Sequence, residues 1–245
     1  MASLIHIQET DSTNNYLKKL LLSQSLEEST IVYTDFQTAG KGQRGNIWES
    51  EQEKNLMCSI VLYPDMIKAN EQFIISQIVS LAVAYTLNKY TEGITIKWPN
   101  DIYWKEKKIC GILIENYLEG DIIKEAICGI GININQTIFK SNAPNPVSLK
   151  QITGNDFNLS TILDELQNNI TYYYNKLKNG DFEFIIQKYK ATLFRREGYH
   201  LYNDGTSDFY AVIKNIEPDG ILVLTTKEGK ERHFAFKEVA YIYKS

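Results

Sequence analysis

The sequence predicts an α+β protein, with a mixed β-sheet and helices followed by a small C-terminal β-barrel. Up to about residue 193, short runs rich in β-branched residues alternate with amphipathic segments of helical period. The segment 73–87 is apolar almost all round, which is typical of a buried helix. Beyond residue 196, short strand-like runs are separated by glycine-bearing turns. We therefore expect two domains, one over residues 1–193 and one over residues 196–245.

The elements of the first domain have local causes. Asp11–Thr13 offers helix-capping side chains before a segment whose apolar residues share one helical face. Gly120 and Asp121 separate two strand-like runs, which predicts a hairpin. The predicted strands cover 4–7, 30–36, 56–63, 94–97, 102–104, 109–118 and 122–135. The predicted helices begin after residue 13, cover 73–87, and lie within 163–177 and 182–193.

The C-terminal domain is expected to be all-β. Its turn signals are Asn203–Gly205, Pro218–Gly220 and Glu228–Gly229. The strand candidates between and around them are 209–216, 221–226, 232–236 and 239–243. Short strands with turns at such spacing indicate a small barrel or sandwich, and we predict a barrel.

Composition limits the classes of function. The chain has 245 residues, 43% of them hydrophobic and 23% charged, which is ordinary for a globular protein. A net charge of −4 weighs against general nucleic-acid binding, which needs basic groups to neutralise phosphates. No apolar run has the length of a membrane span, and the N-terminus lacks a signal-peptide pattern, so we expect a cytoplasmic protein. The three cysteines, Cys58, Cys110 and Cys128, lie in apolar runs and are interpreted as buried free thiols.

A polar, glycine-bearing segment runs from Gln37 to Asn55, longer than a simple turn. Its residues 40–45 fit the pattern GxGxxG, but a strand-like run follows where a dinucleotide-binding fold needs a helix. Kinase signatures and a Walker lysine motif are absent from the sequence. A plain surface loop remains one interpretation. The alternative is an anion-binding loop, because glycines let backbone amides approach an anion while Lys41 and Arg44 add positive charge.

A second polar cluster, Lys97–Asp101, is followed by Lys108 and then Gly111. These charged groups adjoin strongly apolar runs, where an unpaired charge is costly. One interpretation is that these residues form an ordinary solvent-exposed turn without a function. The functional one is a site for a phosphate and an acyl group, in which lysines neutralise developing negative charge and Asp101 orients an attacking amine.

The chain resembles biotin protein ligases, the biotin–[acetyl-CoA-carboxylase] ligase family. Four blocks match in order and spacing: Thr10–Asn14, Gln37–Trp48, Lys97–Asp101 continuing through Lys108 to Leu113, and Gly129–Asn133. The most specific of them is the run Lys-Trp-Pro-Asn-Asp with its downstream lysine. The resemblance implies a class II synthetase-like ligase core with a small C-terminal barrel.

It also implies an enzyme with two half-reactions. Biotin and ATP, with Mg²⁺, give biotinyl-5′-AMP and pyrophosphate, and the biotinyl group then passes to a lysine of a biotin carboxyl carrier domain. Some family members form homodimers, so a homodimer is possible here. No nucleic-acid or membrane partner is expected. The chain begins directly at the first ligase strand, so we expect no DNA-binding module and no repressor activity.

The resemblance assigns residues to three roles. The implied biotin-binding residues are Ser12, Thr13, Asn14, Gln37, Gly40, Lys108, Gly111, Gly129 and Gly131. The implied ATP- and adenylate-binding residues are Lys41, Gln43, Arg44, Trp48, Lys97, Asn100 and Asn133. The implied catalytic residues are Lys108, Asp101, Asn100, Lys41 and Arg44. Hydroxyls and amides suit the ureido group of biotin, which offers one acceptor and two donors. No metal-ligand set is implied.

The glycine segment departs from the family pattern, GRGRxGR. Lys41 and Gln43 replace two arginines, and Asn46 replaces a third. Lysine lacks the planar fork of arginine and glutamine lacks its charge, so we expect the adenylate to escape faster than in arginine-bearing relatives. Two alternative functions stay open: a ligase for lipoate or octanoate, and a non-catalytic biotin-binding protein.

Overall fold

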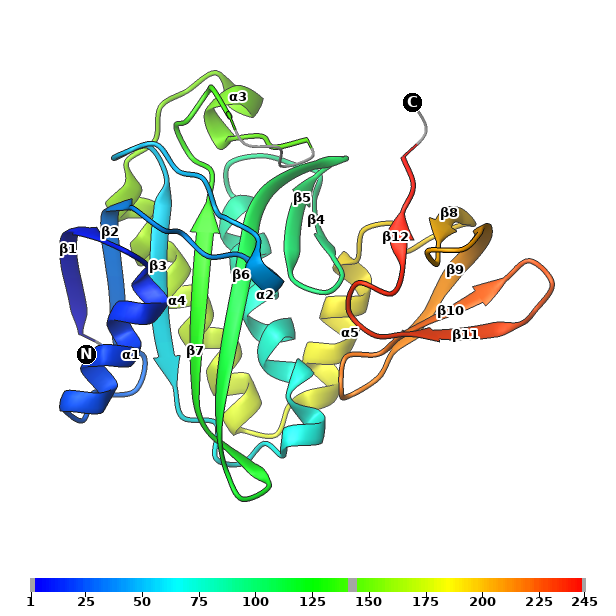
Figure 1. Cartoon of the computed structure of the whole chain (residues 1–245), viewed down its shortest axis with the longest axis horizontal. Helices are drawn as coiled ribbons and strands as arrows, with labels where there is room; N and C mark the ends of the chain where they lie inside the picture. Colours follow the sequence, from blue (N-terminus) through cyan, green and yellow to red (C-terminus); the bar gives the residue numbers. More distant parts are fainter. Residues whose placement is uncertain (1–2, 141–144, 244–245) are drawn as a thin grey trace.

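The fold is seen in a computed structural model that describes residues 3–140 and 145–243. A seven-stranded sheet has the order β1-β2-β3-β7-β6-β5-β4 (Figure 1). In this sheet β1 and β2 pair in parallel, and all the other neighbouring strands pair antiparallel. The strands are β1 (Leu4–Thr10), β2 (Ile31–Gln37), β3 (Leu56–Leu62), β4 (Ile94–Lys97), β5 (Asp101–Trp104), β6 (Lys107–Glu119) and β7 (Ile122–Ile132).

Helices cover both faces of this sheet. On one face lies α1 (Thr13–Ser23), whose Leu17 packs with Val32, Val61 and Ile127 of the strands. On the other face lie α2 (Phe73–Leu87), α4 (Leu159–Lys178) and α5 (Phe182–Thr192) (Figure 1). The short α3 (Leu149–Thr153) and the 3-10 turns η1 (Gln43–Gly45) and η2 (Ala69–Glu71) lie in connections.

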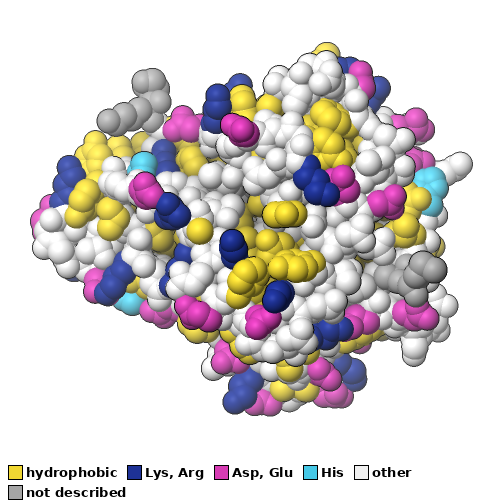
Figure 2. Space-filling view, turned by 180° about the vertical axis from the view of Figure 1, so that it is seen from behind, with side chains coloured by type: hydrophobic (Ala, Val, Ile, Leu, Met, Phe, Trp, Pro, Cys, Tyr) yellow, Lys and Arg dark blue, Asp and Glu magenta, His cyan; other side chains and the backbone are white. Residues whose placement is uncertain are grey.

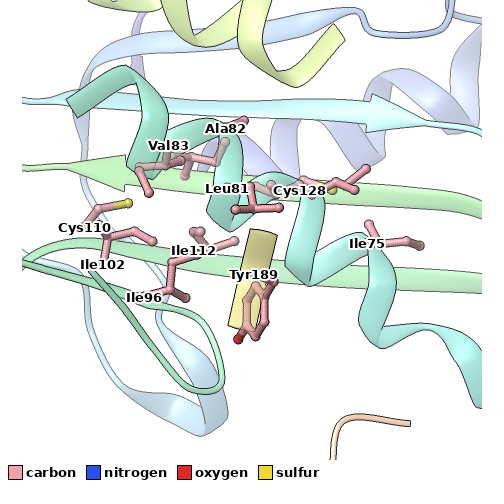
Figure 3. Close-up of a cluster of buried hydrophobic side chains, with 14 of the residues drawn as sticks. Ile75, Leu81, Ala82, Val83, Ile96, Ile102, Cys110, Ile112, Cys128 and Tyr189 are labelled. Carbon is pink, nitrogen blue, oxygen red and sulfur yellow. The ribbon is translucent and has the colours of Figure 1, made fainter. Parts of the chain in front are cut away.

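The main core lies between the sheet and α2. As its apolar pattern predicts, α2 is buried along nearly its whole length, against α4 and α5 as well as the strands. Figure 3 shows part of this core, with Leu81 and Val83 of α2 near Ile96, Ile112 and Cys128 of the sheet. Strand alternation explains the two layers. From Ala126 onward, even-numbered residues of β7 such as Cys128 enter this core, whereas Ile127 joins the α1 side.

Figure 2 shows the molecule from behind, on the side of α2, α4 and α5. Hydrophobic side chains gather near the middle of this face among charged ones (Figure 2). Tyr85 of α2 and Tyr172 of α4 are two large exposed hydrophobic residues of this helical layer. Among the described helices, none combines the length and apolarity that crossing a membrane requires.

The C-terminal part forms a second sheet, of five strands in the order β11-β10-β9-β8-β12. Its strands are β8 (His200–Asn203), β9 (Asp208–Ile216), β10 (Leu222–Thr226), β11 (Glu231–Phe234) and β12 (Ala240–Tyr241). The predicted barrel is wrong: within residues 145–243 the two edge strands, β11 and β12, do not pair with each other. Closure needs the two edge strands to meet with matching tilt and stagger, whereas β11 and β12 stay at opposite edges of the sheet.

The two sheets share one hydrophobic cluster. Tyr202, Leu222 and Phe234 of the second sheet belong to the same cluster as Ile96 and Trp98 of the first. The Trp98 indole Nε1–H donates to the Gly220 carbonyl oxygen at 2.9 Å. The second sheet is therefore packed firmly against the first at the β4–β5 end. The domain boundary near residues 193–196 stays a prediction.

Three local expectations need correction. Ser12 occupies the N-cap position of α1, but its side chain makes no capping hydrogen bond. Instead the Gln37 side-chain oxygen accepts from the Thr13 backbone N–H at 2.8 Å. The strand β8 and the helix α3 were not predicted. The sequence signal for α3 was present, because Ser148 and Gln151 form a reciprocal capping box.

Candidate active site

Backbone pairing aligns the site residues in rows across the first sheet. In one row Lys97 is paired with Asp101, and Asp101 with Gly111. Gly111 is in turn paired with Gly131 of β7. A second row, two residues further along, pairs Gly129 with Ser59. Residues two apart in a strand share a face, so both rows lie on the face that carries α1.

These rows form the floor of a cavity of about 520 Å³. Its walls come from four parts of the chain: the start of α1, the glycine segment, the Lys97–Asp101 turn and the end of the second sheet. The main polar residues around it are Ser12, Thr13, Asn14, Gln37, Lys41, Gln43, Lys97, Asn100, Asp101, Lys108 and Lys237. Most residues of the four predicted blocks are thus brought to one place.

One end of the cavity is a network of hydroxyls and amides. The Ser59 hydroxyl lies 2.6 Å from Asn14 Oδ1 and 2.7 Å from Thr13 Oγ1. Asn14 Nδ2 donates to Glu115 Oε2 at 2.8 Å, which fixes the orientation of the amide. Because Asn14 Oδ1 only accepts, the Ser59 proton points to it.

Gln37 and Ser12 complete this polar end. Gln37 Oε1 accepts from both the backbone N–H and the hydroxyl of Thr13, at 2.8 and 3.2 Å. Its amide nitrogen has no hydrogen-bond partner among the described residues and is available as a donor. Ser12 is buried, with its hydroxyl unused by the helix cap. The end therefore offers both donors and acceptors, as a small polar head group requires.

The other end holds a lysine–carboxylate pair. Lys108 Nζ lies 2.6 Å from Asp101 Oδ1, and both side chains remain about one-quarter or less exposed. A register shift between β5 and β6 sets this geometry. Because of this shift, the consecutive residues Ile109 and Cys110 both enter the main core. The preceding residue, Lys108, therefore faces the cavity.

The glycines give room to two side chains of the protein itself. A Cβ atom at Gly129 would lie 2.2 Å from Asn14 Oδ1. A Cβ atom at Gly131 would lie 2.5 Å from the Trp48 indole, and one at Gly111 would lie 2.9 Å from it. The indole therefore rests directly on the glycine floor. Its Nε1–H is buried without a hydrogen-bond partner among the described residues.

The glycine segment is folded back on itself over the cavity. Lys41 and Ile47 form an antiparallel bridge, and the Trp48 N–H donates to the Gly40 carbonyl. Lys41 Nζ donates to Asn15 Oδ1 at 2.7 Å. Gln43 lines the cavity, whereas the Arg44 side chain lies outside what the structure describes.

Lys97 is a half-buried cation of the site. Its Nζ donates to the Tyr103 hydroxyl at 3.1 Å and lies over aromatic rings. Desolvation lowers the pKa of Lys97 to about 8; Asp101 opposes this effect, while the cations Lys108 and Arg195 add to it. An anion bound at this place would therefore gain a strongly interacting partner.

Two predicted residues do not reach the cavity. Gly40 packs behind it against the Trp48 backbone and Gln37. Asn133 is buried, and its Nδ2 donates to the Val147 carbonyl. Asn100 lines the cavity, but its amide is tied to the carbonyl of Ile112. The roles assigned to these residues stay predictions.

The structure adds residues that the sequence did not suggest. Ser59 and Glu115 support Asn14 from neighbouring strands. The C-terminal part contributes a wall made of Lys237, Val239, Ala240, Tyr241 and Tyr243. The sequence held a signal for Ser59, because it is a polar residue in an apolar strand, two positions from Val61 and therefore on the same face. The C-terminal wall gave none, because it lies far from the other blocks in sequence.

The remaining titratable groups limit the chemistry. Cys58, Cys110 and Cys128 are free and buried, as predicted, and burial raises the pKa of each thiol, which leaves them unreactive. The described residues contain no group of three or more His, Cys, Asp and Glu side chains that could hold a metal ion. Asp101 is the sole carboxylate among the described residues that line the cavity.

The arrangement suits charge neutralisation next to a polar recognition end. A carboxylate and a phosphate brought together at the lysine end would meet Lys97 and Lys108, and the glycine floor would let a flat, extended ligand lie close to the sheet. Asp101 at the same place can accept a proton.

Comparisons with known proteins agree with this geometry. Residues 6–133 match the model of the biotin/lipoate A/B protein ligase family. The chain is 28% identical over 239 residues to a bifunctional ligase/repressor, BirA, of Bacillus spizizenii, covering 93% of this chain and 71% of that protein. It is 26% identical over 232 residues to the biotin–[acetyl-CoA-carboxylase] ligase of Paracoccus denitrificans, covering 92% of this chain and 95% of that protein.

Solved structures give the same result. The biotin protein ligase from Aquifex aeolicus, in complex with biotin and ATP, superposes with a TM-score of 0.81 at 26% identity, over 100% of both chains. The family match covers the strands, the glycine segment and the lysine turn of the cavity, but not its C-terminal wall. The chain therefore belongs to the biotin/lipoate A/B protein ligase family.

Proposed function

We propose that the chain activates biotin with ATP and transfers the biotinyl group to a lysine of a biotin carboxyl carrier domain. One observation carries the proposal: a buried hydroxyl–amide network and the Lys108–Asp101 pair lie at the two ends of a single glycine-floored cavity. That layout fits an acid with a polar head and a carboxylate tail.

The first step would take place at the lysine end. A carboxylate oxygen of biotin attacks the α-phosphorus of ATP, and pyrophosphate leaves. Lys108 and Lys97 stabilise the negative charge that collects on the phosphate oxygens. In the second step the amine of the carrier lysine attacks the acyl carbon, AMP leaves, and Asp101 accepts the amine proton.

The polar end favours biotin over lipoate. Ser12 and the Gln37 amide nitrogen are buried or half-buried groups with unused hydrogen-bonding capacity. The dithiolane ring of lipoate cannot satisfy these groups, whereas the ureido group of biotin can. A site of this kind rejects a ligand that leaves its polar groups unpaired.

Mg²⁺ enters the proposal only with the nucleotide. Among the described lining residues the single carboxylate, Asp101, is paired with Lys108. These residues therefore do not form a set of protein ligands for the ion. Mg²⁺ commonly binds through substrate phosphates and water, with few protein ligands. The predicted carrier is the biotin carboxyl carrier protein of acetyl-CoA carboxylase or of a related carboxylase. The cytoplasmic location, a possible homodimer and the absence of repressor activity stay predictions.

Pyrophosphate exchange tests the proposal. The purified chain is incubated with ATP and labelled pyrophosphate, together with biotin, lipoate or octanoate. Of the three acids, we expect only biotin to support exchange. When a carrier domain is then added, its mass should increase by one biotinyl group. Exchange with lipoate or octanoate but not biotin would establish the rival ligase. Biotin binding without exchange would identify a non-catalytic binding protein.

A further inference from the structure

Lys97 is surrounded by tyrosine rings from two parts of the chain. Its Nζ lies 4.8 Å from the ring centre of Tyr103 on β5. It lies 5.0 Å from the ring centre of Tyr241 and 5.6 Å from that of Tyr243, both from the C-terminal segment. Tyr241 and Tyr243 also line the cavity. The ammonium group is therefore held by aromatic faces that belong to both sheets.

No described carboxylate lies within ion-pair distance of Lys97. Asp101, its neighbour across β4 and β5, is paired with Lys108 instead. The other nearby cation is Arg195, which donates to the backbone carbonyl of Ile242 and lies over the same two C-terminal rings, at 5.8 and 5.0 Å. At close range Lys97 thus contacts the rings, and Asp101 acts on it only from beyond ion-pair distance.

Aromatic faces suit a lysine that must meet an anion. They attract the cation electrostatically without pairing it with a full negative charge. They also exclude water, so a phosphate that reaches Lys97 interacts with it at a low local dielectric. A carboxylate in the same position would compete with the phosphate.

We propose that Tyr241 and Tyr243 are positioning residues of the adenylating site, which hold the Lys97 ammonium group at the cavity wall for the phosphates of the nucleotide. This inference rests on the proposed function. It makes the C-terminal sheet a part of nucleotide recognition, because the two rings reach Lys97 only when that sheet is docked.

The pH dependence follows from the groups that face Lys97, which are Asp101, Lys108, Arg195 and the three tyrosines. With its pKa lowered to about 8, Lys97 is charged below that pH and neutral above it. ATP affinity in the wild type should therefore fall as the pH rises through 8. Removing a ring weakens the attraction that favours the charged form, but it also admits water, and because desolvation is the largest cause of the lowered pKa of Lys97, the pKa should move back toward the ordinary lysine value.

The test measures Lys97 directly, without turnover. The wild type, Tyr241→Ala, Tyr243→Ala and Tyr241→Phe are pulsed with an acetylating reagent between about pH 6 and pH 10, a range that spans ordinary lysine titration. Acetylation of Lys97 is quantified by peptide mass spectrometry. We expect a half-maximum near pH 8 in the wild type. Either alanine variant should shift it to a measurably higher pH.

Two variants serve as controls. Tyr241→Phe should leave the half-maximum unchanged, because the Tyr241 hydroxyl has no hydrogen-bond partner among the described residues and the ring is kept. Tyr210→Ala removes a ring 4.4 Å from Lys227, outside the cavity, and should not affect Lys97. Tyr243 is less buried than Tyr241, so Tyr243→Ala decides the question if Tyr241→Ala does not fold.

Kinetics give the second readout. At about pH 7 the alanine variants should raise KM for ATP several-fold and leave KM for biotin unchanged, while general damage to the fold would raise both. An unshifted Lys97 half-maximum in folded Tyr243→Ala, with unchanged KM for ATP, would overturn the inference. Because labelling needs neither biotin nor turnover, failure of the proposed ligase reaction gives a different result: normal labelling without pyrophosphate exchange.

Discussion

At the scale of single residues, Ser59 shows how a group outside the predicted blocks can organise the polar end. It stands in an apolar strand, yet its hydroxyl contacts both Asn14 and Thr13. Glu115 locks the same Asn14 amide from the other side. Asn14 is therefore oriented before any ligand arrives, which lowers the entropic cost of binding.

We predict that Ser59→Ala weakens biotin binding at least several-fold and lowers the free energy of unfolding by about 1–3 kcal/mol, because it leaves the buried Asn14 Oδ1 without the Ser59 donor. Calorimetric titration with biotin and chemical denaturation measure the two effects. Ser80→Ala is the matched control, since the Ser80 hydroxyl is equally buried but has no hydrogen-bond partner among the described residues. If the two variants behave alike, the network does not organise the site.

Sequence patterns located residues of the site but not their supports. Lys108 and Asp101 stood out because charged groups adjoin apolar runs, and the structure pairs them at 2.6 Å. Tyr241 did not stand out, because its relation to Lys97 exists only after the second sheet has docked. Long-range packing of this kind leaves no local signature.

At the scale of elements, the pattern of side-chain burial was the best guide. The α2 helix has the predicted bounds, Phe73–Leu87, because a segment buried on all sides is apolar on all sides. The barrel prediction was wrong because turn signals fix strand number and spacing, whereas closure depends on the tilt and stagger that bring the edge strands together. The short helix α3 was missed although its capping box was visible.

The turn between β4 and β5 is anchored to the turn between β9 and β10 by Trp98. We predict that Trp98→Phe lowers the free energy of unfolding by about 1–3 kcal/mol, because the buried Gly220 carbonyl loses its donor while most of the ring packing is kept. Denaturant unfolding measures the change. Trp104→Phe should cost less, because the Trp104 Nε1–H donates to the Glu92 backbone carbonyl in an exposed setting where water can replace it. An equal loss in both variants would contradict this account.

At the scale of the whole molecule, the cavity depends on both sheets. The floor and polar end come from the first sheet, and one wall comes from the second. The same hydrophobic cluster runs through both, with Phe236 packed on Trp98 and Phe73 at their junction. The second sheet therefore acts as part of the site.

We predict a single cooperative unfolding transition for the chain, because neither sheet can lose its share of this cluster without exposing the other. Far-ultraviolet circular dichroism and tryptophan fluorescence should give the same midpoint. Phe236→Ala, which removes the ring between Trp98 and Phe73, should lower the midpoint or separate the two signals. Two well-resolved transitions in the unaltered chain would instead support independent domains.

The central claim is that Lys108 and Asp101 mark an adenylating site. The most direct measurement is biotin-dependent exchange between ATP and pyrophosphate for the wild type, Lys108→Ala and the exposed neighbour Lys107→Ala. We predict exchange in the wild type and in Lys107→Ala, and a fall of about 10²–10³-fold in Lys108→Ala, the size expected when a group that stabilises transition-state charge is removed. Exchange at the wild-type rate in Lys108→Ala would contradict the account.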